Sequence, residues 1–178
     1  QELRGKTLGI VGFGRIGQSL ASYALGAGMK VVAVDLFTEK AEIKVPIAGH
    51  GEVAVNINCS KNLNDVIADL DYISIHVPKQ ADGSAVIGTA EFTKMKDGVI
   101  LANAARGGVI DEDALIQALD SGKVRAVALD VFENEPTPRT DLLSHEKIAS
   151  TPHIGAATTE AQTRIGEELA SQIISLLK

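Results

Sequence analysis

Residues 7–17 read TLGIVGFGRIG, and this stretch decides how the chain begins to fold. A short aliphatic run leads into Gly12, Gly14 and Gly17, which have the spacing G-x-G-x-x-G. In such a pattern the first glycine permits a tight turn and the second lets the backbone approach a pyrophosphate. The third lets the following helix pack closely on the sheet. Because the helix N-terminus offers free N–H groups to phosphates, the stretch predicts a dinucleotide-binding strand, turn and helix.

An acidic residue strengthens this prediction, since glycine-rich turns also occur simply where a tight turn needs positive φ. Asp35 ends the second predicted strand, 18 positions after Gly17. A carboxylate at that place is expected to bind the adenosine ribose hydroxyls. It would also repel a 2′-phosphate, and no arginine stands next to it. The sequence therefore predicts NAD as the cofactor rather than NADP.

The composition favours a single α/β domain. The chain has 178 residues, of which 45% are hydrophobic and only 3% aromatic, so aliphatic side chains must build the core. Aliphatic runs alternate with helical stretches, which predicts a doubly wound parallel sheet of the Rossmann type with three layers. The predicted strands are Leu8 to Val11, Val31 to Asp35, Glu52 to Ile57, Tyr72 to His76, Val99 to Ala102, Val124 to Asp130 and Ile148 to Ser150.

Two helices and one irregular segment are also predicted. Asp111 is placed to cap a helix from Glu112 to Ser121. The last helix should run from about Thr159 to Leu177, with Thr159 in capping-box spacing to Gln162. Pro46, Gly49 and Gly51 are expected to leave residues 37–51 without regular structure.

The net charge and the cysteine content restrict the classes of partner that we expect for this chain. The net charge of −6 makes nucleic acid a poor partner. Cys59 is the only cysteine, which rules out an internal disulfide and a cysteine-rich metal site and suggests a reducing cytoplasm. No apolar run approaches the ~18 residues of a membrane span. We therefore expect a cytoplasmic protein without a metal or a membrane partner.

Three polar residues each follow a separate predicted strand. Arg106 lies in NAARGGVID, Glu135 in LDVFENEP and His153 in STPHIGAAT. Ligands of an open parallel sheet bind beyond the carboxyl ends of the strands. Each residue alone could be an ordinary loop residue, but together they are expected to meet at one edge.

Their chemistry suits the oxidation of a hydroxy acid. His153 can act as the base because imidazole titrates near neutrality, and Glu135 can orient it through the other ring nitrogen. Arg106 offers a planar fork that binds a carboxylate through two hydrogen bonds. His76 closes a strand on the adenosine side, so we expect it at the edge of the cofactor rather than in catalysis.

Four blocks in order resemble the nucleotide-binding domain of the D-isomer-specific 2-hydroxyacid dehydrogenases: GKTLGIVGFGRIG, ISIHVP, NAARGGVIDEDAL, and LDVFENEP followed by TPHIGAAT. The resemblance covers the chain from end to end. It implies that Arg106, Glu135 and His153 are catalytic and that Asp130 binds the nicotinamide amide. The resemblance also implies cofactor contacts from Arg15, Ile16, Val77, Pro78, Ala104, Ala105, Arg106, His153, Gly155 and Ala156.

Within this family the chain is most similar to the D-3-phosphoglycerate dehydrogenases, which implies a role in serine biosynthesis. Glyoxylate, hydroxypyruvate and D-lactate enzymes share the catalytic set and stay open as alternatives. A non-catalytic NAD-sensing module such as a corepressor is a further alternative, because that architecture also recruits protein partners. The resemblance also implies a substrate domain outside residues 1–178 and a homodimer formed mainly through the nucleotide-binding domain.

The first prediction concerns cofactor choice. The chain should bind NAD in strong preference to NADP, because the Asp35 carboxylate would repel the 2′-phosphate. Asp35→Ala should narrow the preference. Titration of both cofactors tests this, and equal affinity of the unaltered chain for the two would contradict it.

Overall fold

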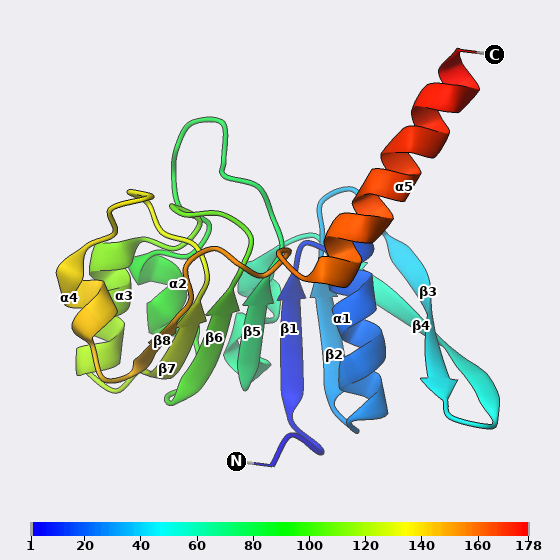
Figure 1. Ribbon diagram of the computed structural model, residues 1–178. Helices are drawn as coiled ribbons and strands as arrows, with labels where there is room; N and C mark the ends of the chain where they lie inside the picture. Colours follow the sequence, from blue (N-terminus) through cyan, green and yellow to red (C-terminus); the bar gives the residue numbers. More distant parts are fainter. Residues whose placement is uncertain (1, 178) are drawn as a thin grey trace.

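The computed structural model describes residues 2–177 and has an eight-stranded sheet at its centre (Figure 1). The strand order is β3-β4-β2-β1-β5-β6-β7-β8. All neighbouring strands are parallel except β3 and β4. This is the predicted doubly wound α/β architecture. The strands are β1 (Thr7–Val11), β2 (Lys30–Val34), β3 (Lys40–Ile47), β4 (Gly51–Ser60), β5 (Tyr72–Ile75), β6 (Val99–Asn103), β7 (Val124–Leu129) and β8 (Ile148–Ser150).

Helices lie on both faces of the sheet and give three layers. On one face α1 (Arg15–Gly26) packs on Leu8 and Ile10 of β1. On the other face α3 (Glu112–Asp120) packs on β7, and its buried side chains belong to the same core cluster as Leu101 of β6. The remaining helical segments are η1 (Leu63–Asp65), η2 (Ile67–Asp69), α2 (Thr89–Lys94), α4 (Thr140–Ser144) and α5 (Thr159–Leu176).

The turn between β1 and α1 has the close contacts that its glycines predict. Gly12 adopts φ 94°, and a Cβ there would lie 2.6 Å from the carbonyl oxygen of His76. A Cβ on Gly17 would lie 2.3 Å from the carbonyl oxygen of Gly12. Any larger residue at either position would push α1 or the end of β5 away from the turn.

The expectation of an irregular segment over residues 37–51 is wrong. β3 occupies Lys40–Ile47 and pairs with β4 in an antiparallel hairpin at the edge of the sheet. Ile43 and Val45 are buried in the cluster that contains α1. The alternating positions Glu42, Lys44 and Pro46 are exposed, so the segment has the two-residue period of a strand. Pro46 is tolerated because β3 is an edge strand.

Other predicted elements are confirmed within a few residues. Asp111 caps α3 by accepting a hydrogen bond from the amide of Ala114 at 2.9 Å. The cap of α5 is Thr158 and not the predicted Thr159, and its hydroxyl oxygen accepts from the amide of Ala161 at 3.1 Å. No residue of α5 is buried, and the helix extends away from the sheet (Figure 1). Among residues 2–177, no helix has both the length and the apolar character needed to cross a membrane.

One half of the sheet has an open face. The side chains of β7 that face α3 are buried, whereas Ala128 on the opposite side of β7 and Ala149 of β8 are exposed. In Figure 1, α1 lies on this side of the sheet beside β2 and the β3–β4 hairpin, away from β7 and β8. Parallel strands are normally covered on both faces. The exposed small apolar residues therefore leave room for a further layer.

The second prediction tests the close packing of α1. Gly17→Ala should lower the free energy of unfolding by about 1–3 kcal/mol, because the new methyl group would overlap the Gly12 carbonyl. Gly166→Ala is the matched control, since it also lies in a helix but meets no atom within 4 Å. The control should be neutral or stabilising by up to about 1 kcal/mol. Urea unfolding measures both, and equal effects would contradict the packing argument.

Candidate active site

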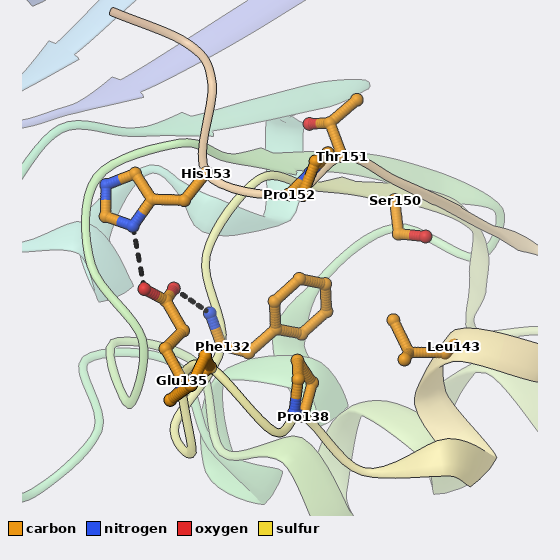
Figure 2. A pocket seen from close by; sticks show the side chains of 9 residues that line it. Phe132, Glu135, Pro138, Leu143, Ser150, Thr151, Pro152 and His153 are labelled. Atoms are coloured by element: carbon orange, nitrogen blue, oxygen red, sulfur yellow. Dashed lines mark hydrogen bonds and ion pairs between the residues drawn. The ribbon is translucent and has the colours of Figure 1, made fainter. Parts of the chain in front are cut away.

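The centre of the site is a hydrogen bond between the loops that follow β7 and β8. His153 Nδ1 lies 2.7 Å from Glu135 Oε2 (Figure 2). The other carboxylate oxygen, Glu135 Oε1, accepts a hydrogen bond from the amide of Phe132 at 2.9 Å. The prediction that Glu135 comes within hydrogen-bond reach of His153 is therefore confirmed.

The charges of this pair determine which ring nitrogen carries the proton. The hydrogen bonds from His153 and from the Phe132 amide hold the pKa of Glu135 below its ordinary value. An ionised carboxylate only accepts hydrogen bonds, so His153 Nδ1 must be the donor. In the neutral ring this leaves Nε2 as the basic nitrogen.

The turn that carries His153 has an unusual backbone. His153 adopts φ 56°, in the left-handed region that L-residues seldom occupy. The buried carboxylate of Asp130 holds the turn in place (7% exposed). It accepts hydrogen bonds from Thr151 Oγ1 at 2.5 Å, the amide of Ile154 at 2.8 Å and the amide of Gly155 at 2.8 Å. Burial acts to raise the pKa of Asp130, but these hydrogen bonds outweigh it and the pKa is lowered.

Arg106 lies on the loop after β6, the strand next to β7. Its side chain is exposed, and Nη1 donates to the carbonyl oxygen of Ala105 at 2.7 Å. Buried Asn103 shapes this loop by accepting from the amide of Ala105 and donating to the carbonyl oxygen of Arg106, both at 3.0 Å. The loops of Arg106, Glu135 and His153 thus follow three adjacent strands at one edge of the sheet.

A pocket of about 410 Å³ lies beside the Glu135 and His153 pair. In Figure 2, Nε2 of His153 points away from Phe132 and Leu143, which line this pocket. The pocket is therefore behind the pair and not on the side of the basic nitrogen. Its lining consists of Phe132, Glu135, Pro136, Pro138, Leu143, Ser150, Thr151, Pro152 and His153.

The residues predicted to hold the phosphates of NAD leave the start of α1 open. No side chain caps the helix at Gly14, and a Cβ on Gly14 would meet no atom within 4 Å. Arg15 and Ile16 begin the helix, and both are exposed. The helix N-terminus can therefore be approached by an anion.

Asp35 is held at the adenosine end of the same edge. Its Oδ2 accepts from the amide of Phe13 at 2.7 Å, and its Oδ1 accepts from Phe37 at 2.8 Å and Thr38 at 2.7 Å. Burial acts to raise the pKa of Asp35, but these three amides lower it below its ordinary value. A carboxylate has about four acceptor sites, so capacity for one ribose hydroxyl is left.

The other predicted cofactor residues lie on neighbouring loops. His76, Val77 and Pro78 follow β5, and the Nε2 atom of His76 lies 2.9 Å from Ser74 Oγ. Burial lowers the pKa of His76, which disfavours its charged form. Ala104 and Ala105 follow β6, while Gly155 and Ala156 follow the His153 turn. Among residues 2–177, no group of three or more His, Cys, Asp or Glu side chains could hold a metal ion.

Comparison with known proteins identifies the family. The model of the D-isomer specific 2-hydroxyacid dehydrogenase NAD-binding domain matches residues 1–155. The chain belongs to this family.

Among relatives of this dehydrogenase domain, a hydroxypyruvate reductase of Thermotoga maritima is 45% identical over 180 residues. A D-3-phosphoglycerate dehydrogenase of Archaeoglobus fulgidus is 41% identical over 178 residues. The alignments cover 99% of this chain but 55% and 32% of those proteins. The structure of a glyoxylate reductase from Paecilomyes thermophila superposes with a TM-score of 0.82 at 34% identity, over 100% of this chain and 51% of that one. The chain thus spans about half or less of the length of these relatives.

Sequence reasoning missed two residues that shape the dehydrogenase site. Asn103 is the last residue of β6 and opens the motif block NAARGGVID, and an asparagine at the end of a strand is a signal for a side chain that bonds to the following backbone. Thr151 had no role, and its contact with Asp130 joins positions 21 residues apart. No local pattern predicts such a contact.

The third prediction concerns Asp130. Asp130→Asn should lower the free energy of unfolding by about 2 kcal/mol at pH 7, because an amide cannot accept all three hydrogen bonds. A carboxylate whose pKa is lower in the folded than in the unfolded protein stabilises the fold when the pH is above its unfolded-state pKa of about 3.9. This stabilisation is lost as the pH falls through its folded-state pKa. The difference in free energy of unfolding between the unaltered protein and Asp130→Asn should therefore become smaller below about pH 4.

Urea unfolding at several pH values measures this deficit. Asp97→Asn is the control, because Asp97 is exposed and paired only with Lys123. It should change the free energy of unfolding by less than about 1 kcal/mol. A deficit of Asp130→Asn that grew toward acid pH would contradict the assigned role.

Proposed function

We propose that this chain is the NAD-binding half of an enzyme that oxidises a D-2-hydroxy acid to the 2-keto acid and catalyses the reverse reduction. The 2.7 Å hydrogen bond between Glu135 and His153 is the observation that carries the proposal. It supplies an oriented base at the edge of the sheet where the loop of Arg106 and the glycine turn after β1 also lie. A complete set of Arg106, Glu135 and His153 favours the enzyme over the NAD-sensing module, which is distinguished by the activity of the full-length protein.

The residues present fit NAD. The open N-terminus of α1 would hold the pyrophosphate, Asp35 the ribose, and the loops after β5, β6 and β8 the nicotinamide end. Asp130 would bind the nicotinamide amide in addition to holding the His153 turn. NAD, when bound, supplies the hydride acceptor.

The chain's own residues supply the other parts of the reaction. His153 Nε2 would take the hydroxyl proton of the acid, and ionised Glu135 would stabilise the resulting imidazolium across the Nδ1 hydrogen bond. Arg106 would hold the carboxylate of the substrate with its planar guanidinium. In the reverse direction the imidazolium returns the proton to the oxygen of the keto acid.

For the substrate we propose D-3-phosphoglycerate, which places the enzyme in serine biosynthesis. The motif DVFENEP and the 41% identity to a D-3-phosphoglycerate dehydrogenase support this choice. The hydroxypyruvate reductase relative makes D-glycerate the first competitor.

We also propose a substrate domain outside residues 1–178 and a cytoplasmic homodimer. The exposed face of β7 and β8 and the helix α5, none of whose residues is buried, support further contacts. In α5 the apolar residues Ile165, Leu169 and Ile173 repeat at four-residue spacing and are each about half exposed. Relatives about twice as long as the aligned segment support an additional domain.

The fourth prediction concerns activity. The 178-residue chain should bind NAD but turn over hydroxy acids very poorly, because catalysis needs a positioned substrate and the exclusion of water. The full-length protein should oxidise D-3-phosphoglycerate. In it, His153→Asn should lower kcat at least about 100-fold with little change in NAD affinity.

Steady-state assays with D-3-phosphoglycerate, D-glycerate and D-lactate, together with NAD titration, test these statements. His50→Asn is the control, because His50 is an exposed histidine in the β3–β4 hairpin connection. Full-length protein that binds NAD tightly yet oxidises none of the acids would favour the sensor. Turnover by the isolated chain equal to that of the full protein would contradict the two-domain account.

A further inference from the structure

A buried carboxylate lies close to the proposed catalytic loops but outside the proposed catalytic set. Glu112 begins α3 and is only 7% exposed. Burying a carboxylate is costly unless it is well paired. Burial raises the pKa of Glu112, and its hydrogen bond from the Glu133 amide offsets this only in part. A carboxylate at position 112 therefore costs free energy of folding that an apolar side chain would not cost.

The contact of Glu112 is with the backbone of the loop that carries Glu135. Glu112 Oε1 accepts a hydrogen bond from the amide of Glu133 at 2.9 Å. The preceding amide, that of Phe132, donates to Glu135 Oε1 at 2.9 Å (Figure 2). Two consecutive amides are thus bound by two carboxylates, one from α3 and one from the loop itself.

The same peptide group contacts the loop of Arg106. A Cβ on Gly107 would lie 1.8 Å from the carbonyl oxygen of Phe132 and 2.8 Å from the amide nitrogen of Glu133. The peptide between Phe132 and Glu133 is therefore confined between Gly107 and Glu112. The Phe132 amide lies in the preceding peptide plane, which meets this one at the Cα of Phe132. A displacement of the Phe132–Glu133 peptide would therefore shift that Cα, move the Phe132 amide away from Glu135 and free the carboxylate that orients His153.

We propose that Glu112 is a positioning residue for the Glu135 and His153 pair. It fixes the Phe132–Glu133 peptide and with it the Cα of Phe132, so that the Phe132 amide stays within reach of Glu135 Oε1 and Oε2 faces the imidazole. Glu112 touches neither substrate nor cofactor in this account. The inference rests on the proposed function for its kinetic consequence, but its structural consequence is independent of any activity.

The kinetic test uses the full-length protein. Glu112→Ala should lower kcat for the hydroxy acid about tenfold, with KM and the NAD dissociation constant changed by less than about twofold. Glu112→Gln keeps an acceptor oxygen and should retain kcat within about threefold. Asp113→Ala is the matched control: it removes an exposed carboxylate from the same helical turn, where Asp113 pairs only with Arg139. It should leave kcat unchanged.

A double-mutant cycle separates positioning from a general loss of structure. If Glu112 acts through Glu135, adding Glu112→Ala to Glu135→Ala should cost no further kcat. An equal loss in both backgrounds would overturn the proposal. If Glu112→Ala does not fold, Glu112→Asp takes its place in the cycle, because its shorter side chain withdraws the acceptor from the Glu133 amide.

A spectroscopic readout needs no turnover. The proton shared by His153 Nδ1 and Glu135 should give a low-field imidazole NMR signal that disappears in Glu112→Ala and persists in Glu112→Gln and Asp113→Ala. An unaltered signal in Glu112→Ala would overturn the proposal even if the protein is active. If the unaltered protein shows the signal but oxidises no acid, loss of the signal in Glu112→Ala would support the positioning role and contradict only the proposed function.

Discussion

Parallel pairing around β1 is the constraint on which the rest of the structure depends. β1 pairs with β2 on one side and β5 on the other, and β6, β7 and β8 continue the parallel order. Because every one of these strands ends at the same edge, the loops that follow them must meet there. Residues as distant in sequence as Gly12 and His153 thereby share one edge of the molecule. The antiparallel hairpin of β3 and β4 extends the sheet without changing that edge.

The loops at this edge are held by buried polar side chains rather than by a hydrophobic core of their own. Asn103 holds the loop after β6, and Asp130 holds the turn after β8. Each side chain is nearly inaccessible to solvent and bonds to backbone groups of the loop it supports. Buried polar groups of this kind specify a single arrangement, because any other arrangement would leave them unpaired. Each loop can then present a different exposed functional side chain while a buried polar side chain holds its backbone.

The sequence predicted the architecture well because its signals were local. The glycine spacing, the aliphatic runs and the Asp111 cap each depend on a few neighbouring residues, and the loops of Arg106, Glu135 and His153 were placed by strand order alone. The β3–β4 hairpin was not predicted, because Pro46 and the nearby glycines indicated an irregular segment. The alternation of the buried Ile43 and Val45 with exposed residues was the weaker signal. The supports from Thr151 and Asp130 join positions far apart in the chain, so their pairing emerges only in the folded structure. Cofactor and catalytic roles came from the family resemblance and from chemistry, not from periodicity.

The left-handed backbone of His153 restricts which side chains this site could ever use. Asparagine, aspartate, histidine and glycine occupy that conformation with the least strain. Of these, only histidine has an ordinary pKa near neutrality. At this position glutamate or lysine would have to adopt a strained left-handed backbone conformation in order to take part in proton transfer. The backbone conformation of the turn and the acid–base chemistry thus independently favour histidine. Substitution at position 153 is restricted by conformation as well as by reactivity.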